Sequence, residues 1–163
     1  MKRLLAALVV LSACKSSHHA ATGVAPARIG DAVKFDDSEW VVLDVNDAGK
    51  VLESTSAINH ETRKTEGRFV IVHYKVTNST KDEQMLITPP KIVDKKGDGV
   101  EHIAMESFFL PPSEKTVALD TLEPNQPREY WTVFDVPAGA TGLQCEFHAL
   151  AAFGQKREVD LKL

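Results

Sequence analysis

The sequence predicts an all-β domain, an antiparallel β-sandwich, and three observations support this class. In residues 66–78, side chains of a wholly apolar face alternate with those of a face that becomes polar, and this two-residue period is that of a strand. Shorter segments of the same kind recur about every eight to twelve residues, separated by turn-forming residues. No segment has a sustained helical period. The 163 residues, of which 43% are hydrophobic, suit one domain with one core.

Residues 66–78 form the most regular segment, and we expect them to be the central strand. One face of this strand is wholly apolar, whereas the other begins apolar and becomes polar along the chain. The first face carries Val70, Val72, Tyr74 and Val76, and the second carries Phe69, Ile71, His73 and Lys75. This pattern predicts one fully buried face.

The segment before this strand predicts two or three shorter strands. Residues 29–35 and 38–45 flank a turn, residues 46–49 (Asn-Asp-Ala-Gly) indicate another turn, and residues 51–52 follow as a short strand. Residues 54–65 are polar and without period, so we expect a loop.

The segment after it predicts a series of strands and turns. Residues 84–88 form a strand that Pro89 and Pro90 end, and residues 94–99 (Asp-Lys-Lys-Gly-Asp-Gly) form a hairpin tip. The remaining expected strands are residues 91–93, 100–103, 128–136, 143–149 and 156–162, with a turn at 122–127. Residues 104–121 fit either an irregular crossover or a short edge strand.

Three segments together carry a family resemblance. They are the strand at 66–78, with its Gly-x-Phe-x-x-Val start and Thr-Asn end, the Asp-x-x-Gly hairpin from Asp94, and Val-Phe-Asp-Val-Pro at 133–137. In this order they resemble a bacterial family of uncharacterised immunoglobulin-like domains found in lipoproteins and secreted proteins, similar in fold to a small secreted immunogenic-protein superfamily. The resemblance implies an immunoglobulin-like sandwich, and because the family has no agreed catalytic residues, it implies no particular site. Asn125 stands where that family usually has Gly, and Asn tolerates the left-handed conformation.

The N-terminus has the pattern of a secretory signal peptide. Lys2 and Arg3 precede an apolar run at 4–11, which is shorter than the roughly 20 residues that a transmembrane helix needs. Residues 11–14 (Leu-Ser-Ala-Cys) resemble the bacterial lipobox. The resemblance implies cleavage before Cys14 and attachment of acyl chains such as palmitate to that residue, which would anchor the protein stably in the membrane.

These features predict three regions: a lipoprotein signal peptide at 1–13, a lipid-anchored flexible tether at 14–28 and the immunoglobulin-like sandwich at 29–163. Cleavage removes two cationic residues and no acids, so the formal charge changes from −4 to −4 − 2 = −6. Because no basic cluster is present, we expect no nucleic-acid partner. The expected location is extracytoplasmic, on the bacterial cell membrane, and the outer membrane if the source is Gram-negative.

Few residues are candidates for chemistry. Cys145 alternates with Leu143 and Phe147, which predicts a buried, inert thiol. Phe108, Phe109 and Leu110 are either an exposed partner-binding patch or a segment folded back over a sandwich edge. The hairpin from Asp94 lacks the third and twelfth ligands of an EF-hand, and the histidines at 60, 73, 102 and 148 are scattered, so we expect no metal site.

The sequence therefore favours a binding or interaction module of the cell envelope, without a cofactor and without catalysis. The partners would be the membrane, through the lipidated Cys14, and an envelope protein or ligand that the sequence does not name. The alternative is an envelope carrier of a metal or small ligand that uses the surface histidines. A structural protein without a defined ligand is a third hypothesis.

The lipobox leads to a direct prediction. Cys14→Ala removes the acylated sulfur, so the protein should leave the membrane fraction and appear in the soluble extracytoplasmic fraction. Cell fractionation with immunodetection measures this change, with Cys145→Ala as the matched control that should stay in the membrane fraction. Full membrane retention of the Cys14→Ala protein would contradict the lipid anchor.

Overall fold

The structure is a computed structural model that describes residues 26–57, 60–151 and 154–163. The signal peptide, Cys14 and the tether up to residue 25 lie outside the described residues. No helix in the described ranges is long and apolar enough to cross a membrane. The described elements are β1 (Ala27–Arg28), β2 (Ala32–Lys34), β3 (Ser38–Glu53), β4 (Thr62–Asn78), β5 (Gln84–Leu86), β6 (Lys91–Val93), β7 (Gly99–Val100), the 3-10 helix η1 (Glu106–Phe108), β8 (Asp120–Leu122), β9 (Pro127–Val136), β10 (Gln144–His148) and β11 (Lys156–Asp160).

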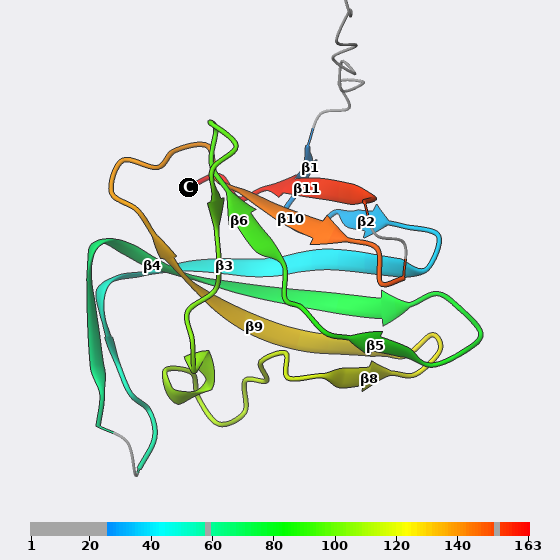
Figure 1. The fold of residues 1–163 in the computed structure, drawn as a ribbon, viewed down its shortest axis with the longest axis horizontal. Helices are drawn as coiled ribbons and strands as arrows, with labels where there is room; N and C mark the ends of the chain where they lie inside the picture. Colours follow the sequence, from blue (N-terminus) through cyan, green and yellow to red (C-terminus); the bar gives the residue numbers. More distant parts are fainter. Residues whose placement is uncertain (1–25, 58–59, 152–153) are drawn as a thin grey trace, which may run out of the picture.

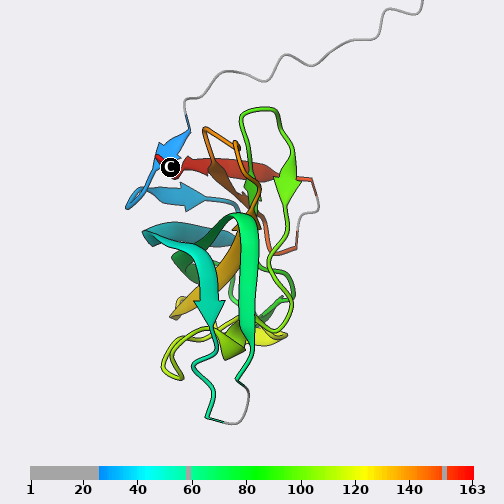
Figure 2. The same cartoon turned by 90° about the vertical axis from the view of Figure 1, so that its left-hand side faces the viewer.

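The strands form two main sheets that enclose the core (Figures 1 and 2). One has the order β2-β3-β4-β9 and the other β1-β11-β10-β6-β7, while β5 and β8 make a separate two-stranded ribbon. All neighbours are antiparallel except β1 and β11, which run parallel. The predicted antiparallel β-sandwich is thus confirmed, with one parallel pair.

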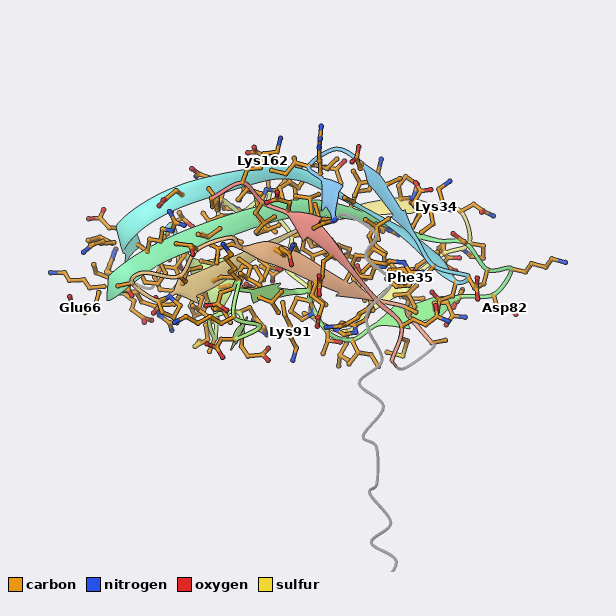
Figure 3. All side chains as sticks on the ribbon, turned by 90° about the horizontal axis from the view of Figure 1, so that it is seen from above. Lys34, Phe35, Glu66, Asp82, Lys91 and Lys162 are labelled. Carbon is orange, nitrogen blue, oxygen red and sulfur yellow. The ribbon has the colours of Figure 1, made fainter. Side chains whose placement is uncertain are left out.

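The central position of β4 is also confirmed. It pairs with β3 on one side and with β9 on the other. Val70, Val72, Tyr74 and Val76 are completely buried, as the alternation predicted. Figure 3 shows Glu66, within β4, and Asp82, which follows it, at opposite ends of the domain, so β4 runs along its length.

The main core lies between the two sheets. It combines the inner face of β4 with residues from both ends of the chain, among them Trp40, Phe134, Cys145, Phe147, Val159 and Leu161. Trp40, Tyr74 and Phe147 form an aromatic cluster with ring centroids 5.0 to 6.0 Å apart. Such tilted contacts add to the apolar burial that stabilises the sandwich.

A second core lies on the outer face of the β3-β4-β9 sheet. Residues 103–110 fold over this face and bring Phe109 and Leu110 against Leu52, Phe69 and Val133. This contact explains why the outer face of β4, which becomes polar along the chain, begins with apolar residues. It also places Phe109 and Leu110 in the interior, at 4% and 1% exposure, which matches the folded-back alternative for this segment.

The expected turn at residues 46–49 is wrong, because β3 continues through it to Glu53. The turn-forming residues make bulges in the strand instead, with register shifts between Asp47, Gly49 and Val51. Gly49 has φ = 76°, and its N–H donates to the Asp47 carboxylate at 2.9 Å. The same residue chemistry suits a turn or a left-handed bulge, and pairing with β4 decides for the bulge. The segment at 51–52 is accordingly part of β3.

Other boundaries shift by a few residues. Strand β1 pairs with β11 from Ala27, two residues inside the predicted tether, and Asp31 accepts a hydrogen bond from the Arg28 N–H at 2.9 Å. The strand predicted at 29–35 is shorter in the structure and comprises only β2, because Gly30, with φ = 91°, turns the chain. Residues 104–121 contain η1 and β8 rather than a single edge strand.

Three residues of the family motifs have clear structural roles. The Asn78 side chain is buried and donates to the carbonyls of Asp82 and Leu122 at 2.8 and 2.9 Å, which ties the end of β4 to the end of β8. Asn125 has φ = 57°, as expected for a residue that replaces glycine in this turn. At Gly67, a Cβ atom would lie 1.9 Å from the Val136 carbonyl oxygen.

Gly67 provides a stability prediction. Gly67→Ala forces the backbones of β4 and β9 apart and should lower the free energy of unfolding by more than about 2 kcal/mol. Gly99→Ala is the matched control, since a Cβ there meets nothing within 4 Å. It should leave stability unchanged or slightly higher. Urea denaturation measures both variants, and equal midpoints would contradict the prediction.

Cys145 provides a reactivity prediction. The residue is fully buried between Leu143 and Phe147, and burial, with a smaller effect of the Glu146 carboxylate, raises the pKa of its thiol well above the ordinary value. In a Cys14→Ser chain, Cys145 should therefore not react with a disulfide reagent in native buffer and should react fully in denaturant. A spectrophotometric thiol assay measures this difference. Rapid native labelling would show that the thiol is accessible.

Candidate functional site

The candidate site is an apolar groove at one end of the sandwich, between the β5–β6 connection and the end of β10. It encloses about 280 Å³. Trp40 and Phe147 from the aromatic cluster reach it from the core. It is lined by Trp40, Met85, Leu86, Ile87, Thr88, Pro89, Pro90, Phe147, His148, Ala149, Leu150 and Gly154.

The β5–β6 connection, which forms one wall of the groove, contains two prolines. The β5 ladder with β8 ends at Leu86, and Pro89 and Pro90, which have no N–H to donate, lie where the chain crosses to β6 in one of the main sheets (Figure 1). Pro90 is buried, whereas Ile87 and Thr88 remain exposed on the crossing. The crossing therefore presents apolar side chains without a neighbouring strand to cover them.

Hydrogen bonds connect the floor of the groove to its opposite wall. The Trp40 indole N–H donates to the Ser38 hydroxyl at 3.1 Å, and that hydroxyl donates to Asp37 at 2.8 Å. The second Asp37 oxygen accepts the Ala151 backbone N–H at 2.7 Å. Because these side chains are buried or partly buried, the network holds the segment after β10 in a fixed position relative to β3.

Exposed apolar side chains extend the groove onto the surface. Met85 and Ile87 are 52% and 61% exposed, and both line it. Leu119, 65% exposed, precedes Asp120, the residue that pairs with Leu86. Three of the five large hydrophobic side chains that are exposed in the described ranges thus belong to the β5–β8 ribbon or its ends. A surface of this kind is typical of an interaction site.

The groove has few polar side chains, and the carboxylate nearest to its His148 is engaged in ion pairs. The side chains that bring polar atoms are Thr88, His148 and the indole of Trp40. His148 Nε2 lies 3.1 Å from Glu146, which also accepts from Lys156 at 2.6 Å. Burial opposes ionisation of Glu146, but Lys156 and His148 outweigh it and lower its pKa. A carboxylate engaged in this way is a poor general base.

A second hollow, of about 840 Å³, lies over the exposed face of β6, β10 and β11. Its walls mix cations with anions, and several of the charges pair: Lys156 contacts Glu146 and Glu158 at 2.6 and 3.5 Å. The carboxylate of Asp94, at its rim, accepts the N–H groups of Lys96 and Asp98 and so closes the hairpin tip. Balanced, paired charges do not select one class of ion.

The residues singled out in the sequence do not gather at the groove. Cys14 lies outside the described residues. Phe108 is half-buried, and Phe109 and Leu110 pack in the second core. His148 alone among the histidines lines the groove in the described ranges.

His73, His102 and His148 have separate carboxylate partners on different elements. His73 stacks on Trp131, with centroids 3.9 Å apart, and lies 2.9 Å from Glu129. His102 lies 3.8 Å from Glu106. No group of three or more possible metal ligands converges among the residues that the structure places. The geometry therefore adds no support for a carrier that would use these histidines together.

Sequence reasoning did not identify Glu106 or the groove. Glu106 is only 5% exposed, and burial raises its pKa to about 7 while a hydrogen bond from the Val133 N–H lowers it. Its sequence signal was a single acidic residue before Ser-Phe-Phe-Leu. The signal for the groove was an apolar strand that ends at two prolines, but pairing with β8 and proximity to β10 are tertiary facts.

Solved structures of low identity share this fold. The YjhA protein of Bacillus subtilis is 13% identical with a TM-score of 0.62, over 82% of this chain and 98% of that one. A conserved hypothetical protein of Bacillus anthracis is 15% identical with a TM-score of 0.57, over 81% and 94%. The candidate lipoprotein YcdA of Bacillus subtilis is 16% identical with a TM-score of 0.52, over 81% of this chain and 39% of its own.

Sequence comparison places the chain in a family. No curated protein sequence matches it. The family model described as "Domain of unknown function (DUF4352)" matches residues 27–158, which extend from β1 into β11 and include every residue that lines the groove. The chain belongs to the DUF4352 family.

Proposed function

We propose that this protein is a lipid-anchored, extracytoplasmic binding module of the bacterial cell envelope that recognises a partner protein through the apolar groove. The observation that supports this proposal is the groove itself, with exposed Met85 and Ile87 above a floor of Trp40 and Phe147. Partner proteins commonly insert one apolar or aromatic side chain into such a pocket. The module carries out no catalysis.

The size of the groove suits one inserted side chain of a partner protein. Pockets for drug-sized ligands enclose roughly 300–1,000 Å³, and this groove, at about 280 Å³, lies just below that range. It has room for one large anchor residue. The exposed surface of Met85, Ile87 and Leu119 would then contact the flanking parts of the partner.

The envelope location rests on the N-terminal pattern. Cys14 after the apolar run would carry the lipid, and residues up to 26 would separate the domain from the bilayer. One structurally similar protein, YcdA, is named as a candidate lipoprotein, which is compatible with this location. We also infer that the sandwich is an immunoglobulin-like variant related to the small secreted immunogenic proteins, which its two main sheets, antiparallel except for the β1–β11 pair, support.

Site-specific crosslinking tests the groove. A photo-crosslinking amino acid that replaces Ile87 in the full-length chain should give a discrete protein adduct in intact cells, and one that replaces Val51 should not. Adding Met85→Glu should weaken the adduct at least about tenfold, because a charge would have to be buried against the partner. Val51→Glu is the matched control, since Val51 and Met85 have similar exposure, 46% and 52%.

The outcomes separate the hypotheses. Equal adducts from positions 51 and 87, or no effect of Met85→Glu, would contradict recognition through the groove. An adduct of position 87 with a small molecule and with no protein would favour the small-ligand carrier instead. Both glutamate variants should unfold within about 0.5 kcal/mol of the wild type, since the changes are at the surface.

A further inference from the structure

Residues 105–119 form a strap along the outside of β9, the edge strand of its sheet. The chain leaves β7, pairs His102 with Phe134 in an isolated bridge, and then passes over the edge. Met105 and Leu119 bound the strap, and both have left-handed backbone angles, φ = 57° and 59°. Their side chains are 58% and 65% exposed, so side-chain burial does not offset the free-energy cost of these backbone angles.

Each end of the strap is attached to β9 through a carboxylate. At one end, a Glu106 carboxylate oxygen accepts the Val133 backbone N–H at 2.8 Å. If another strand lay beside β9 here, one of its backbone carbonyls would accept this N–H instead. At the other end, Asp120 accepts hydrogen bonds from the Tyr130 hydroxyl and from Lys115. The Trp131 N–H also donates to the Lys115 carbonyl at 2.8 Å.

The two carboxylates differ in their partners. Burial opposes ionisation of Asp120, but hydrogen bonds from the Lys115 ammonium and the Tyr130 hydroxyl outweigh it and keep the pKa of Asp120 below its usual value. Glu106 is almost fully buried and has one backbone donor, so its pKa rises to about 7. The Asp120 end therefore stays ionised and paired, whereas the Glu106 end titrates near neutral pH.

The groups that face Glu106 do not compensate for its charge. His102, on the same connection, places Nδ1 3.8 Å from Glu106 Oε1, and its side chain is 39% exposed. Tyr74 of β4 lies on the core side, and burial and then Glu106 raise the pKa of its hydroxyl, so it stays neutral. The Val133 N–H of β9 is the third neighbour. None of these groups is a lysine or an arginine, so no permanently charged cation among them faces the carboxylate.

We propose that residues 105–110 lift reversibly from β9 while the Asp120 end of the strap stays attached, and that ionisation of Glu106 favours the lifted state. Lifting breaks the Glu106–Val133 bond and the bonds from Thr55 N–H and Oγ1 to the carbonyls of Phe108 and Leu110, at 2.8 and 2.5 Å. It also exposes Phe109 and Leu110, which the sequence had indicated as a possible binding patch.

The direction of the pH effect follows from the two states of Glu106. The lifted carboxyl titrates near the ordinary value of 4.5 and the closed one near 7. The closed state is therefore most stable below the lower value and loses stability as the pH rises through the interval between them. The population of the lifted state should increase roughly tenfold between about pH 6 and about pH 8.

Amide hydrogen exchange on the full-length chain tests the proposal, because two kinds of reporter lie outside the lifting segment. The N–H groups of Val133 and Thr55 bond to residues 106 and 108, whereas that of Trp131 bonds to residue 115. Protection of Val133 and Thr55, corrected for intrinsic rates, should fall roughly tenfold between about pH 6 and about pH 8. Protection of Trp131 should not change.

Three variants identify the group whose ionisation causes the pH dependence of protection. Glu106→Gln keeps an acceptor for Val133 and should abolish the pH dependence of its protection. His102→Gln and Glu101→Gln, which remove a neighbouring histidine and an exposed acid, should retain the pH dependence.

A parallel fall in the protection of Val133 and Trp131 would show that the domain opens as a whole and would overturn the proposal. A pH dependence that persists in Glu106→Gln, or flat wild-type protection, would also overturn it. If Glu106→Gln does not fold, the wild-type comparison of Val133 with Trp131 decides.

Discussion

The burial of β4, complete along its inner face in the core and partial on its outer face, is the constraint on which the rest of the structure depends. Its inner face, with Val70, Val72 and Tyr74, supports the core between the sheets, and the start of its outer face, with Phe69, supports the second core. A strand inside a sheet satisfies its backbone groups through its neighbours, so its side chains can be apolar on both sides. The outer face must then be covered, and residues 103–110 provide that cover.

The groove and the Glu106 end of the strap lie at different positions along β4. The groove is built near Trp40, which pairs with Val76 close to the end of β4, whereas the strap crosses near Val133, which pairs with Ile71 near its middle. At the groove, apolar residues remain exposed because no neighbouring strand in the described part of the chain covers the crossing from β5 to β6. At the strap, apolar residues are buried, and an acidic side chain replaces a backbone carbonyl at the sheet edge. Both arise where regular pairing stops.

Much of the fold could be predicted because it depends on local patterns. The alternation in 66–78 located β4, and the hairpin at 94–99 and the strand at 128–136 followed from turn residues and period. The turn expected at 46–49 failed because Asp47 and Gly49 serve a bulge as well as a turn, and only pairing with β4 distinguishes them. Phe109 and Leu110 had two possible positions, since an apolar run does not indicate what it packs against.

The sequence by itself determined the strand composition of the domain and the burial of Cys145, and it defined the motif residues Gly67, Asn78 and Asn125. These properties follow from side-chain period, residue volume and the allowed backbone angles at single positions. Only the tertiary structure decided the position of the groove, the coverage of the outer face and the burial of Glu106. The physical reason is that each depends on contacts between segments far apart in the chain: Trp40 with Phe147, Leu52 with Phe109, and Glu106 with Val133.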